Sequence, residues 1–209
     1  MDRDARLRKA VQWLGKKDPV LKKLIQKVGP CTLKPIGSPY HVLVKSVVGQ
    51  QLSTKAAASM QKKLIDRFGS RNKFPTPENL VNLSHEELRS AGMSNAKAQT
   101  LHRIGIAYSE KTITDSKLRK LDDENVIEEL CKIKGIGPWT AEMVLMFALD
   151  RWDHFSLNDL VLRKAVEIHY GIDRNSKKEI INHANLYSPY KTIFSWYLWA
   201  SISNGDEEW

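Results

Sequence analysis

Cysteine is nearly absent from this chain, since Cys31 and Cys131 are the only two among its 209 residues. Two cysteines so far apart provide neither a disulfide framework nor the clustered thiolates of a zinc or iron–sulfur site. Residues 1–6 contain no apolar signal segment, and no run approaches the roughly 18 apolar residues of a membrane span. We therefore expect a protein with reduced thiols that works inside a cell, in solution.

Strand signals are also scarce. The chain lacks alternating polar and apolar runs, and it lacks Asn-Gly or Asp-Gly turns between such runs. Helix-start signals recur instead, either as a capping residue before proline or as serine with glutamate three residues later. They are Asp18-Pro19, Ser38-Pro39, Thr76-Pro77, Ser84 with Glu87, Ser176 with Glu179, and Ser188-Pro189. The sequence therefore predicts an all-α protein.

Positive charge is in excess. Lys and Arg number 33 against 24 Asp and Glu, which gives a formal net charge of +9 and a sequence pI near 9.5. Such a balance is typical of nucleic-acid-binding proteins, although charge alone does not identify one. A chain of this length can form two lobes with a hydrophobic core.

The most informative motif is a glycine-rich turn at residues 132–141, which read KIKGIGPWTA. Both glycines can take φ > 0 and let the backbone approach a partner without a Cβ in the way. Pro138 suits the first position of a following helix, whose N-terminal N–H groups attract an anion such as phosphate. Lys132 and Lys134 add positive charge beside it. The motif favours phosphate binding over the alternative, an ordinary turn between two helices.

A single acidic residue, Asp159, follows this turn at a predicted helix start that begins at Ser156. On one reading the carboxylate sits at the third helical position, where it completes a cap and complements the helix dipole. On the other reading it is a functional carboxylate. Spacing alone leaves both open.

Four spaced motifs together carry a family resemblance. They are Gly49-Gln50-Gln51-Leu52-Ser53, Ala91-Gly92-Met93-Ser94 with Lys97-Ala98, the hairpin from Lys134 to Ala141, and Asp159. In this order they resemble the helix-hairpin-helix (HhH-GPD) DNA glycosylase superfamily, and within it the 3-methyladenine DNA glycosylase II branch. The similarity extends from about Leu7 to Trp199.

This resemblance implies a two-lobed, wholly helical fold with the active-site cleft between the lobes. Residues 1–35 would pack with residues 151–209 as one lobe. Residues 36–150 would form a helical barrel lobe that contains the helix-hairpin-helix unit at about 123–149.

The resemblance also implies the chemistry. The family's single catalytic aspartate lies at the N-terminal end of the helix after the hairpin unit, a position that Asp159 matches. A fixed carboxylate stabilises the positive charge that develops on deoxyribose and helps a water molecule attack. An alkylated purine leaves as a neutral base, which reduces the need for a general acid. The expected reaction releases purines of the 3-methyladenine and 7-methylguanine class and leaves an abasic site.

Trp139 occupies the hairpin position at which related glycosylase/lyases carry the lysine that forms a Schiff base. The iron–sulfur cysteines of those enzymes are missing too, so we expect a monofunctional hydrolase. Trp139 and Trp199 match aromatic residues of the base pocket, which would stack on a flipped, cationic base. Tyr187 stands where the branch usually has tryptophan, so the same pocket would have a different shape. Core packing is the alternative for Trp199, whose helical neighbours are apolar.

Four hairpin residues are expected to contact DNA: Lys134, Gly135, Gly137 and Thr140. Gln51 matches the family's residue that inserts through the minor groove, and Met93 matches a second wedge. Without the resemblance, Gln51 reads as a polar residue at a helix end and Met93 as a core contact that anchors its loop.

The implied partner is double-stranded DNA with alkylated bases, bound by a monomer inside the cell, in the bacterial nucleoid or the eukaryotic nucleus. No organic cofactor and no side-chain metal site is implied, although the family's hairpin often holds a monovalent cation through backbone carbonyls. Two alternatives stay open. One is a helix-hairpin-helix glycosylase for oxidised or deaminated bases, and the other is a non-catalytic DNA-binding module that reuses the hairpin.

Overall fold

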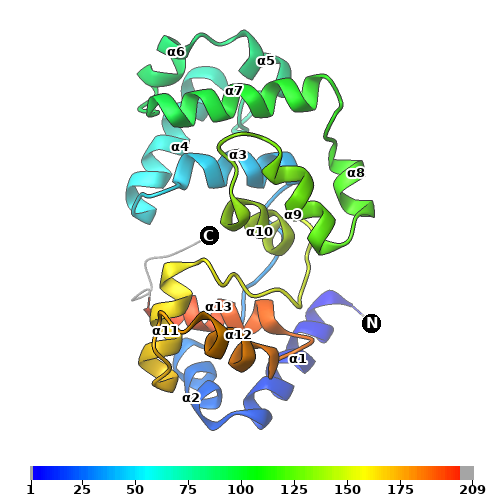
Figure 1. The fold of residues 1–209 in the computed structure, drawn as a ribbon, viewed down its shortest axis with the longest axis vertical. Coiled ribbons are helices and arrows are strands. Elements are labelled where there is room, and N and C mark those ends of the chain that lie inside the picture. Colours follow the sequence, from blue (N-terminus) through cyan, green and yellow to red (C-terminus); the bar gives the residue numbers. More distant parts are fainter. Residues whose placement is uncertain (1, 203–209) are drawn as a thin grey trace. The chain divides into compact units, whose positions relative to one another are not determined.

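The structure is a computed structural model that describes residues 2–202 of the 209-residue chain. These residues form thirteen helices and no β-strand, so the all-α prediction is confirmed (Figure 1). In chain order the helices are α1 (Arg3–Lys17), α2 (Pro19–Val28), α3 (Pro39–Gly49), α4 (Thr54–Phe68), α5 (Pro77–Asn82), α6 (His85–Ser90), α7 (Asn95–Ser109), α8 (Asp115–Lys120), α9 (Asp123–Cys131), α10 (Pro138–Phe147), α11 (Leu160–Tyr170), α12 (Lys177–Asn185) and α13 (Lys191–Ile202). None of these helices is long and apolar enough to cross a bilayer.

The chain divides into two compact units. Unit 1 comprises Met1–Lys34 and Asp150–Trp209, of which residues 2–34 and 150–202 are described. Unit 2 comprises Pro35–Leu149. Unit 1 therefore contains α1, α2 and α11 to α13, and unit 2 contains α3 to α10.

Helix α3 forms the centre of unit 2, where it packs against α4, α7 and α10. Its apolar residues at positions 42–44 and 47–48 are all buried, because they face neighbouring helices on several sides. The helix begins as predicted, with Pro39 at its first position and Ser38 as the cap. The Ser38 hydroxyl accepts a hydrogen bond from the His41 N–H at 3.3 Å.

Helices α5 and α7 lie side by side in unit 2 (Figure 1) and meet closely at Gly105. A Cβ at this glycine would lie 2.9 Å from both Leu80 Cβ and the Pro77 carbonyl oxygen, so the close approach requires glycine. Between these helices, α6 begins with the predicted capping box. The Glu87 N–H donates to Ser84 Oγ at 3.1 Å, and the Ser84 N–H donates to the Glu87 carboxylate at 2.8 Å.

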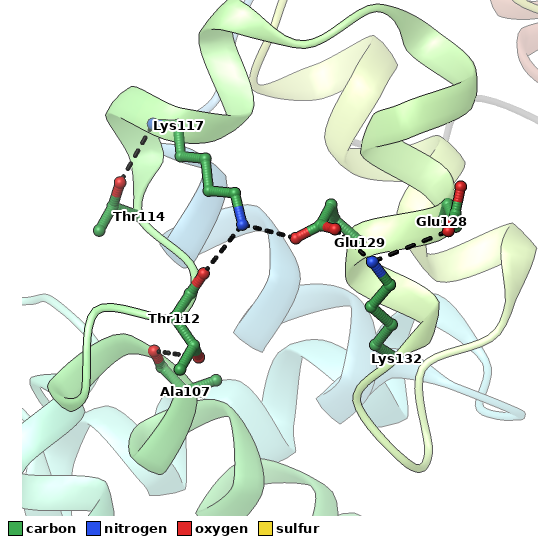
Figure 2. Close-up of polar contacts among 7 residues, drawn as sticks. All are labelled: Ala107, Thr112, Thr114, Lys117, Glu128, Glu129 and Lys132. Carbon is green, nitrogen blue, oxygen red and sulfur yellow. Dashed lines mark hydrogen bonds and ion pairs between the residues drawn. The ribbon is translucent and has the colours of Figure 1, made fainter.

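Helix α8 is tied to α9, the first helix of the hairpin, by an exposed ion-pair network (Figure 2). Lys117 Nζ lies 2.7 Å from Glu129 Oε2 and also donates to the Thr112 carbonyl oxygen at 3.2 Å. The second oxygen of Glu129 accepts a hydrogen bond from Lys132, which lies 3.7 Å from Glu128. The two lysines lower the pKa of the Glu129 carboxyl. Glu128 and Glu129 thus balance the charge of Lys132. Of the two lysines expected to add positive charge beside a phosphate, Lys134 is the candidate that remains.

Helix α13 forms the centre of unit 1, where it packs against α2 and α11. Phe194, Tyr197 and Trp199 on this helix are buried. The two chain segments of unit 1 are joined through Arg3, whose Nε and Nη2 donate to the Asp150 carboxylate at 2.8 and 2.6 Å. This bidentate pair fixes the start of α1 against the residue that opens the second segment.

Two predicted helix-start signals in unit 1 differ from the structure, one in its capping hydrogen bonds and one in its position. Helix α12 begins directly after Ser176, as predicted, but the Ser176 side chain makes no cap hydrogen bond, so the capping box with Glu179 does not form. Helix α13 begins at Lys191 rather than directly after Ser188-Pro189. The reason is a tight turn in which the Tyr190 N–H donates to the Tyr187 carbonyl oxygen at 2.7 Å before the helix starts.

Candidate DNA-binding hairpin and catalytic carboxylate

The hairpin of unit 2 consists of α9, the turn at residues 132–137, and α10. Gly135 has φ +103°, a left-handed value that favours glycine. A Cβ at this position would lie 2.0 Å from Thr100 Oγ1 on α7. The fold itself therefore requires glycine at position 135.

Gly137 is different, because its φ of −104° and ψ of 174° are extended values that any residue adopts. The positive φ that both glycines allow is thus used only at Gly135. Apart from Gly137 itself and its two neighbours in the chain, no described residue has a heavy atom within 4 Å of the place where a Gly137 Cβ would be. Glycine here leaves open space at the cap of α10, where Pro138 takes the first helical position as predicted.

Thr140, in the first turn of α10, is only 1% exposed. Its Oγ1 accepts a hydrogen bond from Gln50 Nε2 at 2.9 Å, so the hydroxyl faces the end of α3 inside unit 2. Lys134 and Gly135 are exposed, and the Lys134 carbonyl oxygen accepts a hydrogen bond from Arg103 Nη1 at 3.2 Å. Of the four hairpin residues predicted to contact DNA, Thr140 is therefore placed to support the turn from inside.

The predicted minor-groove residue, Gln51, lies in the loop between α3 and α4. Gln51 is exposed and has φ +57°, an uncommon value for a residue with a side chain. Leu52 beside it is 37% exposed. Lys97 of α7 donates from Nζ to the Val48 carbonyl oxygen at 2.7 Å, which caps the last turn of α3 just before this loop.

The other predicted wedge, Met93, lies in the turn before α7 and is only 3% exposed. Its neighbour Gly92 is exposed and has φ +94°. Burial favours the second reading of Met93, a core contact that anchors its loop. Insertion into DNA would require this side chain to leave the core, so the wedge role stays a prediction.

In unit 1, Asp159 is the N-cap of α11 and is 5% exposed. Its Oδ1 accepts hydrogen bonds from the Leu162 N–H at 2.8 Å and from Trp199 Nε1 at 3.3 Å. The helix begins at Leu160, so the carboxylate occupies the cap position, and Ser156 belongs to the turn before it. Capping and function are therefore compatible, because the cap fixes the carboxylate at the positive end of the helix dipole.

The three predicted pocket aromatics have different surroundings. Trp199, 2% exposed, is the one whose indole reaches the carboxylate. Tyr187 is 3% exposed and stacks on Phe194 with ring centroids 3.9 Å apart, and its hydroxyl donates to Asp18 Oδ2 at 2.6 Å. Trp139 is half-buried at the start of α10 in unit 2. The burial of Trp199 favours the alternative of core packing, and the pocket roles of all three aromatic residues stay predictions.

A buried polar cluster around Asp18 is not predicted by the sequence. Asp18 Oδ1 accepts the Val20 N–H at 2.8 Å, while Oδ2 accepts the hydroxyls of Tyr170 and Tyr187, each at 2.6 Å. His183 Nε2 lies 3.2 Å from the Tyr187 hydroxyl. Burial raises the pKa of the Asp18 carboxyl, but the hydrogen bonds from the two tyrosines and from the backbone N–H groups of Val20 and Leu21 together outweigh burial and hold this pKa below its ordinary value. The sequence marks Asp18 only as the residue before Pro19 at a helix start, and this pattern does not reveal its distant partners.

A cation at the hairpin would depend on backbone carbonyls, because the described residues contain no group of three or more His, Cys, Asp or Glu that could hold a metal ion. The carbonyl oxygens of Ile133, Lys134 and Gly135 each accept one hydrogen bond within unit 2. A carbonyl oxygen has two lone pairs, so each can still coordinate an ion. The free lone pairs leave room for an ion, and the monovalent cation at the hairpin stays a prediction.

Helices α9 and α10 and the glycine turn that joins them form a helix-hairpin-helix unit within this all-α fold. Comparison with known proteins makes the class specific. Residues 44–189 match the family described as HhH-GPD superfamily base excision DNA repair protein, and the chain belongs to this family.

Relatives and solved structures agree with this assignment. In Schizosaccharomyces pombe, the Alkylbase DNA glycosidase-like protein mag2 is 32% identical over 203 residues, which is 95% of each chain. DNA-3-methyladenine glycosylase 1 of the same organism is 33% identical over 208 residues, 96% of this chain and 90% of the relative. The structure of S. pombe 3-methyladenine DNA glycosylase (Mag1) in complex with abasic DNA has a TM-score of 0.84 at 32% identity and covers 96% of this chain and 100% of that one. The predicted fold is confirmed.

Proposed function

We propose that this protein is a monofunctional DNA N-glycosylase that excises alkylated purines, of the 3-methyladenine and 7-methylguanine class, from double-stranded DNA. The observation that carries the proposal is the Asp159 carboxylate, fixed at the cap of α11 by the Leu162 N–H and the Trp199 indole. Binding to DNA alone would need the hairpin but not a fixed, buried carboxylate. Relatives named DNA-3-methyladenine glycosylase, at up to 33% identity over most of the chain, support the substrate class.

The reaction breaks the bond between C1′ of deoxyribose and the purine nitrogen, and the base leaves with the electron pair. Positive charge develops on the sugar, where the Asp159 carboxylate would stabilise it. The oxygen of water then bonds to C1′, and the proton that it loses passes to the carboxylate or to solvent. An alkylated purine already carries a positive charge and leaves as a neutral molecule. One carboxylate is therefore sufficient.

The flipped base would stack on Trp199, whose ring attracts a cationic purine. Tyr187 would complete the pocket wall with a ring that its bond to Asp18 holds in place. Trp139 has no amine that could attack C1′, so the reaction ends in hydrolysis rather than in a Schiff base.

The hairpin would hold one phosphate of the DNA backbone. The open space at Gly137 lets the phosphate approach the N-terminus of α10, and the exposed Lys134 adds positive charge beside it. A monovalent cation on the hairpin carbonyls would add further charge at this phosphate. Gln51 would fill the gap that the flipped nucleotide leaves, from the minor-groove side. We propose that the enzyme acts on DNA as a monomer inside the cell.

The test measures release of labelled bases from methylated DNA, compared with duplexes that contain hypoxanthine or 8-oxoguanine. Methylated purines should be released fastest, and sodium borohydride should trap no protein on the DNA. Faster release of hypoxanthine or 8-oxoguanine would favour a glycosylase for deaminated or oxidised bases. Binding without any release would favour a non-catalytic module, and efficient borohydride crosslinking would contradict the monofunctional assignment.

A further inference from the structure

Gln50 connects the two segments of unit 2 that are proposed to contact DNA. Its Nε2 donates to Thr140 Oγ1 at 2.9 Å and to the Gly135 carbonyl oxygen at 3.4 Å. The same residue is the C-cap of α3 and directly precedes Gln51. One side chain therefore bonds to the hairpin, while its own backbone begins the loop that carries the minor-groove residue.

The bond to Thr140 satisfies a buried group. Thr140 is 1% exposed, and its N–H is already bonded to the Gly137 carbonyl oxygen at 3.0 Å. A hydroxyl in such a position needs a partner, because leaving it without one costs desolvation energy. Gln50 supplies that partner, and the hydrogen bond fixes the position of the Gln50 side chain.

Contacts from α7 hold both segments that Gln50 connects. Lys97 bonds to the last turn of α3 at 2.7 Å, and Arg103 bonds to the hairpin backbone at 3.2 Å. Thr100 packs so tightly on Gly135 that even a Cβ would collide with it. The end of α3 and the hairpin thus rest on one helix, and Gln50 bridges them directly.

We propose that Gln50 is a positioning residue that sets the spacing between the phosphate held by the hairpin and the gap filled by Gln51. The inference rests on the proposed function, which assigns those two contacts. Gln51 has φ +57°, and a residue with a side chain keeps such a value only where its surroundings hold it. A flipped nucleotide requires the phosphate contact and the filling side chain at the same time. An intact duplex requires only the phosphate contact. Incorrect spacing should therefore weaken binding only to DNA with a flipped nucleotide.

The test compares affinity for a duplex that contains a tetrahydrofuran abasic analogue with affinity for the intact duplex of the same sequence. In Gln50→Ala, affinity for the intact duplex should be nearly unchanged. Preference for the abasic duplex should fall roughly two- to tenfold, the effect of one neutral hydrogen bond. The rate of single-turnover base release at saturating enzyme should fall by a similar factor.

Substitutions of Thr140 separate the hydrogen bond from packing. Thr140→Val keeps the shape without the acceptor and should behave like Gln50→Ala, whereas Thr140→Ser keeps the hydroxyl and should behave like wild type. The double variant should lose no more than Gln50→Ala alone, because the bond that Thr140→Val deletes is already absent in Gln50→Ala. Gln61→Ala is the matched control, since Gln61 Nε2 donates to the Lys45 carbonyl oxygen of the same α3 at 3.4 Å.

The outcomes distinguish this inference from the proposed function. A wild-type protein that neither prefers the abasic duplex nor releases bases contradicts the proposed function. Where wild type does both, three results overturn the inference: full preference in Gln50→Ala, additive losses in the double variant, or equal losses on both duplexes. Thermal melts of each variant show whether equal losses come from unfolding.

Discussion

The Trp199 indole N–H donates a hydrogen bond to Asp159 Oδ1 at 3.3 Å, and the same oxygen accepts the Leu162 N–H at 2.8 Å. Two donors, one from α13 and one from α11, thus converge on a single carboxylate oxygen. Because α11 packs against α13, the orientation of this carboxylate depends on the packing of the two helices. Trp199 therefore positions Asp159, in addition to the stacking role proposed for its ring.

Replacing Trp199 with Phe removes the indole N–H and keeps an aromatic ring. Single-turnover base release should fall by about tenfold, the effect of one hydrogen bond to a charged group, while affinity for intact DNA is unchanged. Trp196→Phe is the matched control, since Trp196 lies on the same helix and its ring contacts Tyr197. Equal losses in the two variants would assign the effect to helix packing.

We expect the same substitution, glycine to valine, to have opposite effects on stability at the two hairpin glycines. Gly135→Val should lower the melting temperature, because its φ of +103° and the collision with Thr100 both oppose a side chain. Gly137→Val should melt like wild type, because its backbone is extended and the space for a Cβ is open. It should nevertheless weaken binding to damaged and intact duplexes by similar factors, and flatten the log–log salt dependence by about one unit, as expected for one phosphate contact. A folded Gly137→Val protein with unchanged affinity would exclude the hairpin as the phosphate anchor.

Gln51→Ala and Met93→Ala should have different effects. Gln51 is exposed, so its truncation should reduce preference for the abasic duplex and leave the melting temperature unchanged. Met93 is 3% exposed. Its truncation should therefore lower the free energy of unfolding by about 2 to 5 kcal/mol, the range for large-to-small core substitutions. Wild-type stability combined with lost preference in Met93→Ala would instead support its role as a second wedge.

Asp18 should make stability depend on pH. Burial raises the pKa of its carboxyl, but the tyrosine and backbone hydrogen bonds together outweigh burial and hold this pKa below the ordinary 3.8. A carboxyl with a lowered folded-state pKa stabilises the fold above its unfolded-state pKa, and this contribution is lost as pH falls through the folded-state value. Asp18→Asn should therefore be less stable than wild type at about pH 7, and the difference should shrink towards about pH 3. Urea denaturation at both pH values measures the difference in free energy of unfolding between wild type and Asp18→Asn. If this difference is the same at both pH values, the effect of Asp18 comes from capping alone.

Local sequence patterns predicted much of the helical structure because their physical causes are local. A cap such as Ser84 with Glu87 joins groups three residues apart, and the structure contains both of its hydrogen bonds. The placement of Asp159 at a helix start has the same origin, and its exact position within the first turn depends on how the preceding loop folds. The pairing of Lys132 with Glu128 also spans a single helical turn, so the helical spacing of charges could have revealed it.

Contacts between distant segments could not be predicted in the same way. Asp18 meets Tyr170 and Tyr187 across 152 and 169 positions, and Gln50 meets Thr140 across 90. Which polar groups meet is decided by the packing of whole helices, and no local pattern records that choice. The inward orientation of the Thr140 hydroxyl therefore became visible only in the folded chain.

The proposed mechanism depends above all on the negative charge of Asp159. Asp159→Asn keeps an oxygen that can cap α11 but removes this charge, so folding and duplex affinity should persist. Single-turnover release of methylated purines should fall by roughly a hundredfold or more, the effect of losing one electrostatic contact to the transition state. Release, duplex affinity and melting temperature are measured on the same preparation. Near-normal release by a folded Asp159→Asn protein would return the residue to helix capping and contradict the mechanism.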